Sequence, residues 1–224
     1  MSGTLYIVAT PIGNLGDITA RALETLRAVD IIACENPLHH LKLLNHFGIK
    51  KRLLEYSPAN EENSAKGLVK LLLDGQNIAL VTDAGVPGVS DPGKSLVSCA
   101  VEAGITVVPV PGPSALTTIA SVFAKSPKRI VFLGFLPKSE TKMGRELALF
   151  REIDCTLVCF ASQHQAKKFL GAVNKVLGNV DVIIGREMTK ANEEFLRGKV
   201  SDILERDFEE RGEFTVAVEI RSES

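Results

Sequence analysis

The sequence predicts an α/β protein of two domains, with a parallel sheet in the N-terminal domain and a mixed sheet in the C-terminal domain. Short apolar runs alternate with helical patterns through the first half of the chain. Nearly continuous apolar strands separated by helices are typical of a parallel sheet that is covered on both faces. The 224 residues are enough for one domain or two modest ones, and either can bury a core.

The first half of the chain contains four expected strands and four expected helices. Thr19 is a suitable N-cap for the first helix, and Gly48 is a suitable C-terminal residue for the second. Strands are predicted over 5–9, 31–34, 78–81 and 106–110, and helices over 19–28, 38–47, 60–73 and 94–103.

A domain boundary is expected where Pro111, Gly112 and Pro113 interrupt the pattern, which gives domains 1–113 and 114–224. Only a short helix joins the last two strands of the second domain, so some antiparallel pairing is expected there. Helices are predicted over 114–123, 138–151, 163–177 and 201–208, and strands over 130–133, 156–160, 180–184, 194–198 and 214–220.

The composition argues against several classes of protein. Apolar residues make up 45% and charged residues 24%, as in ordinary globular proteins, and the net charge of −1 argues against a globally basic nucleic-acid binder. No apolar run approaches the ~20 residues that span a bilayer, and the N-terminus lacks the features of a signal peptide. Each cysteine is expected to be a buried, reduced thiol, which fits a cytoplasmic protein. The cysteines are Cys34, Cys99, Cys155 and Cys159.

Residues 88–95 spell G-x-x-x-x-G-K-S, the signature of a phosphate-binding loop. In such loops the first glycine closely follows a strand, because successive backbone N–H groups wrap the phosphates. Here residues 83–87 intervene, Pro92 removes one donor, and Asp91 places a carboxylate where phosphate oxygens would lie. No later apolar strand ends in an aspartate suited to Mg²⁺. The sequence therefore argues against an NTPase.

Three other loops favour a different ligand. Residues 9–14, 82–87 and 109–115 each follow or end a predicted parallel strand, so they are expected to meet at one edge of the sheet. Their glycines and prolines bring the backbone close to a ligand and fix the shape of each loop. Such a wall suits a bulky zwitterion that carries an adenine. The alternative is that the loops are only tight turns between strands and helices.

These loops and their surroundings resemble the tetrapyrrole methylase superfamily. The resemblance is carried by residues 5–19, 83–87, 90–93 and 111–115, and it is greatest for the branch of bacterial 16S rRNA (cytidine-2′-O)-methyltransferases. It continues through G-F-L-P at 134–137, R-E-M-T-K at 186–190 and G-E-F at 212–214, and so covers nearly the whole chain in order.

The resemblance implies two α/β domains with S-adenosylmethionine in the cleft between them, a homodimer, and 16S rRNA or the small ribosomal subunit as the partner, without a membrane or a metal. A methylase of a tetrapyrrole or other small substrate and a catalytically weakened RNA-binding relative remain alternatives. The cofactor-binding residues that it implies are Pro11, Asp83, Ala84, Gly85, Pro87, Val89, Ser90, Ser114, Ala115, Phe160, Thr189 and Glu213.

The chain departs from the pattern of this family at several positions that bear on substrate and activity. The family usually has E-D-T-R-H where residues 35–39 read E-N-P-L-H, and a threonine where Val86 stands. It commonly has E-S-P-H-R where residues 161–165 read A-S-Q-H-Q. The departing positions include Asn36, Leu38, Val86, Ala161 and Gln165. The glycines and prolines that define the loops are retained.

Methyl transfer from a sulfonium is an in-line displacement, in which the acceptor oxygen has to be held against the methyl group. A ribose 2′-hydroxyl is a poor nucleophile until its proton is taken or shared, so a base or a polarising cation helps. Lys190 and Glu187 are the first candidates, and Glu35 is the third. The alternative for each is a structural or surface ion pair.

The segment 125–151 is the candidate RNA-binding surface. It holds seven basic residues, among them Lys138 and Lys142, against two acidic ones. Such a stretch can neutralise backbone phosphates, although a solvated helix beside a loop explains it equally well. It also contains Phe135 and Phe132, and we expect Phe132 to belong to the core. The histidines lack the spacing of metal ligands, and the adjacent pair points to different helix faces. They are His39, His40, His46 and His164.

Overall fold

The computed structural model describes residues 1–123, 129–162, 165–206, 208–209 and 211–221. The described chain forms two compact units, Met1–Ser114 (unit 1) and Ala115–Ser224 (unit 2). The sequence places the boundary one residue earlier. That each unit is an independent folding domain stays a prediction.

Unit 1 contains a five-stranded sheet in which every strand runs parallel to its neighbours, in the order β3-β2-β4-β1-β5. All four residues of β2 and of β4 are buried, because these inner strands are covered on both faces. The strands are β1 (Leu5–Val8), β2 (Ile31–Cys34), β3 (Arg52–Glu55), β4 (Ile78–Val81) and β5 (Val107–Val110).

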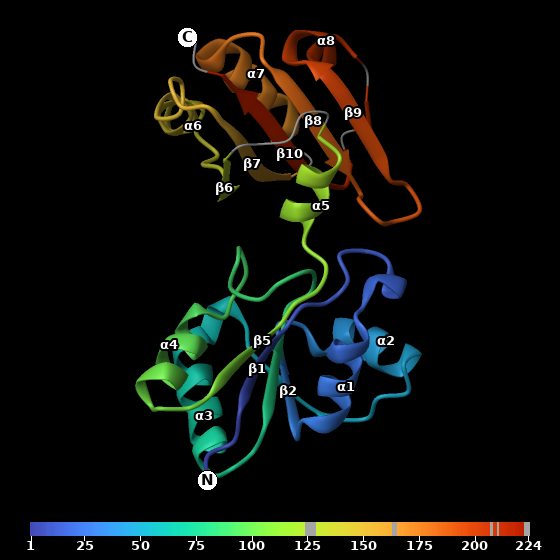
Figure 1. The fold of residues 1–224 in the computed structure, drawn as a ribbon, viewed down its shortest axis with the longest axis vertical. Helices are drawn as coiled ribbons and strands as arrows, with labels where there is room; N and C mark the ends of the chain where they lie inside the picture. Colours follow the sequence, from blue (N-terminus) through green and yellow to red (C-terminus); the bar gives the residue numbers. More distant parts are fainter. Residues whose placement is uncertain (124–128, 163–164, 207, 210, 222–224) are drawn as a thin grey trace. The chain divides into compact units, whose positions relative to one another are not determined.

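Two helices cover each face of this sheet (Figure 1). On one side α1 (Ala20–Ala28) and α2 (Pro37–His46) pack through side chains such as Leu26. On the other side α3 (Glu61–Leu73) and α4 (Lys94–Glu102) pack through side chains such as Leu72. The predicted N-cap of α1 is confirmed, because the Thr19 hydroxyl accepts a hydrogen bond of 3.1 Å from the N–H of Ala22.

Strand β3 is missing from the sequence prediction. Its residues read R-L-L-E, with exposed charges at both ends and only half-buried leucines between them, because β3 lies at the edge of the sheet. The predicted helices of unit 1 are all present, with bounds that differ by one residue or less. Asn36 explains the start of α2, since its side chain accepts a hydrogen bond from the N–H of His39 at 3.2 Å.

Unit 2 contains a mixed sheet in the order β6-β7-β10-β8-β9. Strands β6 and β7 are parallel, and the other neighbours are antiparallel. The predicted antiparallel pairing is therefore present, but β9 and β10 do not pair with each other, because β8 lies between them. The strands are β6 (Ile130–Phe135), β7 (Cys155–Ser162), β8 (Asp181–Arg186), β9 (Glu194–Lys199) and β10 (Glu213–Ile220).

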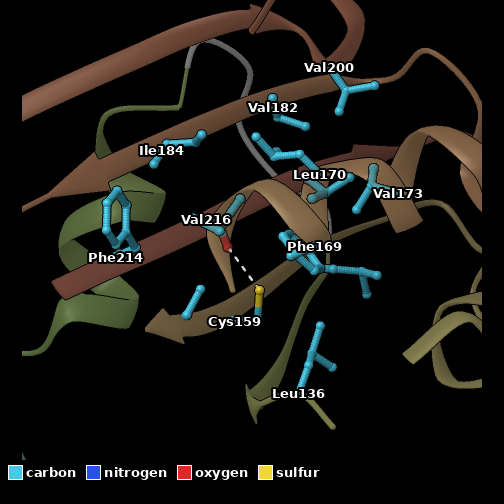
Figure 2. Close-up of a cluster of buried hydrophobic side chains, with 14 of the residues drawn as sticks. Leu136, Cys159, Phe169, Leu170, Val173, Val182, Ile184, Val200, Phe214 and Val216 are labelled. Atoms are coloured by element: carbon cyan, nitrogen blue, oxygen red, sulfur yellow. Dashed lines mark hydrogen bonds between the residues drawn. The ribbon is translucent and has the colours of Figure 1, made fainter. Parts of the chain in front are cut away.

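The core of unit 2 lies between this sheet and the helices α6 (Glu140–Ala148) and α7 (Ala166–Leu177). Figure 2 shows Phe169 of α7 among the apolar side chains of the strands. The Cys159 thiol is 3.8 Å from the carbonyl oxygen of Val216, which it contacts as a weak donor. Two short helices complete the unit: α5 (Ala115–Ser121), which contacts β7, β8 and β10, and α8 (Val200–Glu205). All four of these helices are two to five residues shorter than predicted, and α8 ends before Phe208.

All four cysteines are free thiols, and three of them are buried. The expected burial is wrong for Cys99, which is half-buried because it lies on α4 at the margin of the core. Burial, reinforced by the charges of Asp83 and Glu55, raises the pKa of Cys34 to about 12, so this thiol is neutral at physiological pH. In the described part of the chain, no helix combines the length and the apolar character needed to cross a bilayer.

Candidate functional site

The strand order of unit 1 brings the three predicted loops together. The loops follow β4, β1 and β5, which are adjacent in the sheet, and parallel strands end at the same edge. The chain leaves β1 in one direction across the sheet and leaves β4 in the other, so a topological switch point lies between these two strands. Ligands of open α/β sheets bind at such points. The predicted meeting of the three loops is confirmed.

Backbone hydrogen bonds fix the first two loops against each other. The N–H of Thr10 donates to the carbonyl of Gly85 at 2.8 Å, and the N–H of Gly85 donates to the carbonyl of Thr10 at 3.1 Å. The hydroxyl of Thr10, which is buried, also donates to the carbonyl of Thr82 at 2.9 Å. Gly85 has a φ of 75°, a left-handed conformation that favours glycine. The sequence thus encodes a rigid wall at the end of β1 and β4.

The predicted cofactor-binding residues of unit 1 gather at this edge. Pro11, Gly85 and Pro87 are buried and shape the loops. The predicted contacts that remain open to solvent are Ala84, Val89 and Ser90, while Asp83 and Ser114 are half-buried. Ala115 begins α5 in unit 2. This distribution leaves polar and small groups of the loop 83–90 accessible to a ligand.

Carboxylates concentrate at the ends of β2 and β4. Burial, together with the negative charges of Asp83 and Asp91, raises the pKa of Glu35 above 4.5. Burial and the charge of Asp83 likewise raise the pKa of Asp91, against an opposing effect of the Thr82 side chain. Like charges that approach each other at a half-buried edge disfavour ionisation. This edge of unit 1 is therefore electronegative and would be stabilised by a cation.

His40 contacts Asp83 from the buried side of α2. The two atoms His40 Nε2 and Asp83 Oδ1 are 3.4 Å apart, which is within ion-pair distance. Their geometry does not make a hydrogen bond, and neither atom has another hydrogen-bond partner in the described residues. Burial, and to a smaller extent His39, lowers the pKa of His40 to about 4 although Asp83 opposes the shift. His40 is therefore neutral at pH 7, and the contact is polar rather than an ion pair.

The structure explains why the phosphate-loop signature at 88–95 is not a phosphate site. The N-terminus of α4 is already capped by the carboxylate of Glu61, whose Oε1 accepts hydrogen bonds from the N–H groups of Gly93 at 3.1 Å and Ser95 at 3.3 Å. The hydroxyl of Tyr56 donates to the same oxygen at 3.0 Å and accepts from the N–H of Leu96 at 3.1 Å. A carboxylate of the chain itself thus occupies the position that phosphate oxygens would take.

In unit 2 the family-like segments also meet at one edge of the sheet. The register pairs Phe135 with Phe160, Ser162 with Glu213, and Arg186 with Phe214. The segments 134–137, 186–190 and 212–214, together with residues 161, 162 and 165, therefore all lie at the same end of β6, β7, β8 and β10. These segments are far apart in the sequence, and only the strand order brings them together.

Lys190 lies in this edge between two glutamates. Its Nζ donates to Glu187 Oε1 at 3.0 Å and to Glu213 Oε2 at 2.9 Å, and the N–H of Glu213 donates to the same oxygen of Glu187 at 2.8 Å. Burial of Lys190 opposes its charge, but the two glutamates outweigh this effect and raise its pKa above 10.5. Burial likewise opposes the charge of Glu187, yet hydrogen bonds from Glu213 and Lys190 lower its pKa below 4.5. We call these three residues the Lys190 cluster.

The backbone that carries this cluster is strained. Glu187 and Thr189 have φ values of 49° and 68°, and neither is a glycine. Each such residue costs about 1–3 kcal/mol, and strain of this kind is frequent at functional sites. Gly212, with a φ of 121°, lies so close that a Cβ there would be 2.8 Å from Glu187 Cγ. The N–H of Thr189 donates to Glu193 Oε2 at 2.6 Å, which helps to hold the strained turn.

Phe160 lies beside two other aromatic rings at the same end of the sheet. Its ring centroid is 5.0 Å from that of Phe132 and 5.5 Å from that of Phe135, both edge-to-face. A bulge between Phe132 and Gly134 allows two phenylalanines three positions apart to reach the same neighbour. Phe135 is 60% exposed, and Phe132 is only half-buried, so the expectation that Phe132 is a core residue is wrong.

The departures from the family pattern have ordinary structural roles where the structure describes them. Asn36 caps α2, and Leu38 on the same helix is 76% exposed. Ala161 is buried in β7, and the Gln165 side chain accepts a hydrogen bond from the Ser162 hydroxyl at 3.0 Å. Val86 is half-buried in the loop after β4. Gln163 and His164 lie outside the described residues.

The predicted RNA segment is described from Arg129 onward, and Lys125 and Lys128 lie outside the described residues. Lys138 and Lys142 are exposed on and before α6. His39 is exposed and His40 is buried, as their opposite helix faces predict. Among the described residues no three acidic, histidine or cysteine side chains are arranged to hold a metal ion.

Sequence reasoning missed the contact between His40 and Asp83 and the capping of α4 by Glu61. Both contacts join residues that are far apart in the sequence, and neither His40 nor Glu61 stands in a recognisable motif. The only available signal for Glu61 was its position at the start of a predicted helix. For His40 it was the inward face of α2.

Comparisons with known proteins agree with this arrangement. The family model for tetrapyrrole (corrin/porphyrin) methylases matches residues 4–204. Two curated proteins named ribosomal RNA small subunit methyltransferase I are similar along nearly the whole chain. That of Thermotoga maritima is 42% identical over 219 residues, which are 96% of this chain and 98% of the relative. That of Halalkalibacterium halodurans is also 42% identical over 219 residues, 97% of this chain and 76% of the relative.

Solved structures share the fold at low sequence identity. A structure of diphthine synthase has a TM-score of 0.73 and 17% identity, and covers 97% of this chain and 90% of its own. A structure of the methyltransferase CobJ has a TM-score of 0.73 and 16% identity, and the match covers 98% of this chain and 95% of the CobJ chain. At these identities the similarity concerns the fold alone. It confirms the predicted class, with a parallel sheet followed by a mixed one.

Proposed function

Because this chain belongs to the tetrapyrrole methylase family, and within it to the proteins named ribosomal RNA small subunit methyltransferase I, we propose that it methylates 16S rRNA in the small ribosomal subunit, at the 2′-hydroxyl of a cytidine. S-adenosylmethionine is the proposed methyl donor. The cytoplasmic location and the homodimer that the resemblance implies are part of the same proposal.

One observation in unit 1 carries the donor proposal. The loop after β4 is fixed to the loop after β1 by two backbone hydrogen bonds, and it presents Asp83, whose buried Oδ1 has no hydrogen-bond partner in the described residues. Glu35 and Asp91 add negative charge at the same edge. A ligand that carries a sulfonium and an ammonium group supplies the positive charge that this edge lacks. These residues therefore fit S-adenosylmethionine.

The proposed cofactor contacts come from both units. In unit 1, the small residues of the loop 83–90 leave room for the ligand, and their backbone groups can read its polar ends. Unit 1 contributes Pro11, Asp83, Ala84, Gly85, Pro87, Val89, Ser90 and Ser114. Unit 2 contributes Ala115, Phe160, Thr189 and Glu213.

When bound, S-adenosylmethionine supplies a methyl carbon that its sulfonium makes electrophilic. The acceptor oxygen forms a bond to this carbon as the carbon–sulfur bond breaks, the bonding electron pair goes to sulfur, and the hydroxyl proton passes to a base. Glu35 suits the role of base, because burial and neighbouring carboxylates raise its pKa above 4.5. Lys190 suits that of a polarising cation rather than a base, because Glu187 and Glu213 keep it protonated.

Tritiated methyl transfer tests the proposed function. Small ribosomal subunits that lack the modification are incubated with the protein and tritium-labelled S-adenosylmethionine, and the labelled nucleoside is then identified after digestion. We expect label in 2′-O-methylcytidine of 16S rRNA. Label on a base, or on another RNA, would overturn the proposed position.

A catalytically weakened RNA-binding relative is the alternative that a specific observation favours. Residues 36, 38, 161 and 165 lack the charged side chains usual in the family, and Asn36 and Gln165 instead serve local capping and turn contacts. This alternative predicts thermal stabilisation by S-adenosylhomocysteine and binding of rRNA without incorporation of label. A methylase of a tetrapyrrole or other small substrate would transfer label to that substrate and none to the ribosomal subunit.

A further inference from the structure

Unit 1 carries a second feature that the proposed reaction does not use, a basic surface without acidic residues. Between Glu35 and Glu55 the chain contains four basic residues, Lys42, Lys50, Lys51 and Arg52, and no acidic one. They lie on the outer side of α2, in the turn that follows it, and at the start of β3. We call this surface the α2–β3 strip. Its charge contrasts with the net charge of −1 of the whole chain.

Packing of the apolar residues fixes where these cations point. Leu43 and Leu44 of α2 are buried against the sheet, which leaves Lys42 exposed on the opposite side of the helix. Ile49 is also buried and anchors the turn, so that Lys50 is exposed beside it. Arg52 is exposed because β3 is the edge strand.

A neighbouring helix adds to the strip. The guanidinium of Arg27, in the last turn of α1, donates to the carbonyl of Phe47 at 3.3 Å. This contact places a fifth cation beside the end of α2. His46, which is exposed, packs edge-on against Phe47 with ring centroids 4.7 Å apart.

Three cations of the strip are not held in ion pairs by the described residues. In the described part of the chain, Lys42, Lys50 and Arg52 have no carboxylate within ion-pair distance. In unit 2, by contrast, Lys190 and Lys199 are held in ion pairs.

One acidic residue on the neighbouring strand side of the strip is Asp30. It precedes β2, and the register Ile31–Arg52 puts it beside Lys51. Its carboxylate accepts a hydrogen bond from the N–H of Asn77 at 2.8 Å, so it is engaged at the inner strands. The rest of the positive charge on the strip is left for an external partner.

We propose that the α2–β3 strip binds the phosphate backbone of the RNA substrate. This inference rests on the proposed function for the identity of the RNA. Unpaired lysine and arginine side chains without intervening carboxylates are what neutralisation of successive phosphates requires, and binding of this kind depends on salt rather than on sequence. The strip also begins near the candidate site, since α2 starts one residue after Asn36 and carries His40, which contacts Asp83.

A protein partner is the competing occupant. Leu38 and Leu41 are 76% and 40% exposed on the outer side of α2 and would add apolar area to a protein interface. Protein interfaces are depleted in lysine, however, and the strip is dominated by cations. Phosphate therefore explains more of this surface than a protein does.

The test compares two double variants that change the net charge equally. Lys42→Glu with Lys50→Glu alters the strip, and Lys66→Glu with Lys70→Glu alters exposed lysines of α3 on the other face of the same sheet. Binding of each protein to 16S rRNA is measured over a series of salt concentrations. We expect the strip variant to bind roughly tenfold more weakly or worse, with the slope of log K against log salt reduced by about two. The matched control should keep the wild-type slope.

Two further measurements keep the outcomes separate. The thermal shift caused by S-adenosylhomocysteine should be the same in all three proteins, which shows that unit 1 remains folded and that the donor site is intact. If the wild type transfers methyl groups but the strip variant keeps its RNA affinity and salt slope, the strip does not bind RNA, and a protein partner becomes the better explanation. If the strip variant loses RNA binding but the wild type transfers no methyl group, the proposed function fails and the inference stands.

Discussion

At the scale of single residues, the environment of Lys190 decides which chemistry it can perform. A lysine that acts as a base has to lose its proton near neutral pH, which usually requires burial away from carboxylates. Lys190 instead donates to Glu187 and Glu213, and these contacts raise its pKa. The strained backbone at Glu187 and Thr189 maintains this arrangement at a cost in stability. A residue that is held charged at such a cost is suited to stabilising negative charge.

Replacement of Lys190 by methionine should therefore reduce methyl transfer while the fold is retained. We expect kcat to fall by roughly 10²-fold or more, the range for loss of one electrostatic contact in a transition state. The loss should persist across pH 6–9, since no deprotonated lysine is needed. Lys199→Met is the matched control, because Lys199 forms an exposed ion pair with Asp181 in the same unit. A variant whose activity falls only at high pH would contradict the assignment as a cation.

Replacement of Glu35 is expected to raise stability at pH 7 while it reduces activity. Its pKa is raised in the folded chain, so the folded state binds more protons than the unfolded state between pH 4.5 and the folded pKa. Stability contributed at this residue is thus lost as the pH rises through that window. Glu35→Gln should raise Tm at pH 7 by about 2 °C and lose this advantage below pH 4, while methyl transfer falls.

Thermal melts between pH 3.5 and 8, compared with the exposed Glu24→Gln of α1, measure the effect at Glu35. Equal shifts in the two variants would show that repulsion from Asp83 and Asp91 has no role in the stability of this edge.

At the scale of secondary-structure elements, Glu61 links three elements of unit 1. Glu61 is the first residue of α3. Its carboxylate caps α4 and accepts a hydrogen bond from Tyr56, which lies just after β3. Replacement of Glu61 by alanine removes a charged acceptor from three partly buried hydrogen bonds, which costs about 1–3 kcal/mol. Urea unfolding should show this loss, whereas Glu62→Ala in the same turn should have little effect, because Glu62 is exposed.

The pH dependence of this cap has a defined sign. Burial alone would raise the pKa of Glu61, but hydrogen bonds from Gly93, Tyr56 and Ser95 lower it below 4.5. The contribution of Glu61 is therefore present in full above pH 4.5 and is lost as the pH falls through the folded pKa. The difference between the wild type and Glu61→Ala should shrink in the same range. A constant difference down to pH 3 would mean that the carboxylate charge does not carry the effect.

The elements themselves could be predicted from the sequence to different degrees. Buried strands such as 78–81 are continuous apolar runs, and Thr19 and Gly48 mark helix ends by their chemistry, so these predictions are confirmed. The residues of β3 at 52–55 form no such run, since an edge strand keeps charged residues exposed to water. The position of β10 between β7 and β8 depends on long-range pairing, which no local pattern records.

In the candidate site, too, some contacts could be predicted from the sequence and others could not. Loops at the carboxyl ends of parallel strands share an edge whatever their neighbours, so residues 10 and 85 could be expected to meet. The contact of His40 with Asp83 depends instead on how α2 packs on the sheet. The Lys190 cluster combines both cases, because Glu187 and Lys190 are close in sequence while Glu213 reaches them only through the pairing of β8 with β10.

At the scale of the whole molecule, each unit carries its own candidate RNA-binding surface. The α2–β3 strip belongs to unit 1, and Lys138 and Lys142 belong to unit 2, where they are exposed within a segment of net charge +5. Two surfaces that bind one RNA simultaneously contribute separately to the salt dependence, because each releases its own counterions. They also raise the affinity beyond that of either surface alone.

Charge reversal on both surfaces can therefore tell one binding mode from two. Lys138→Glu with Lys142→Glu should weaken binding of 16S rRNA and reduce its salt slope by about two, as expected for two lost phosphate contacts. Combined with Lys42→Glu and Lys50→Glu, the reductions in slope should add, to about four in total. If the quadruple variant loses no more than one double variant, the surfaces do not bind the same RNA at once. An unchanged slope for Lys138→Glu with Lys142→Glu would mean that this surface of unit 2 does not bind the RNA. This variant changes the net charge as much as the strip variant does, so RNA binding would then rest on unit 1.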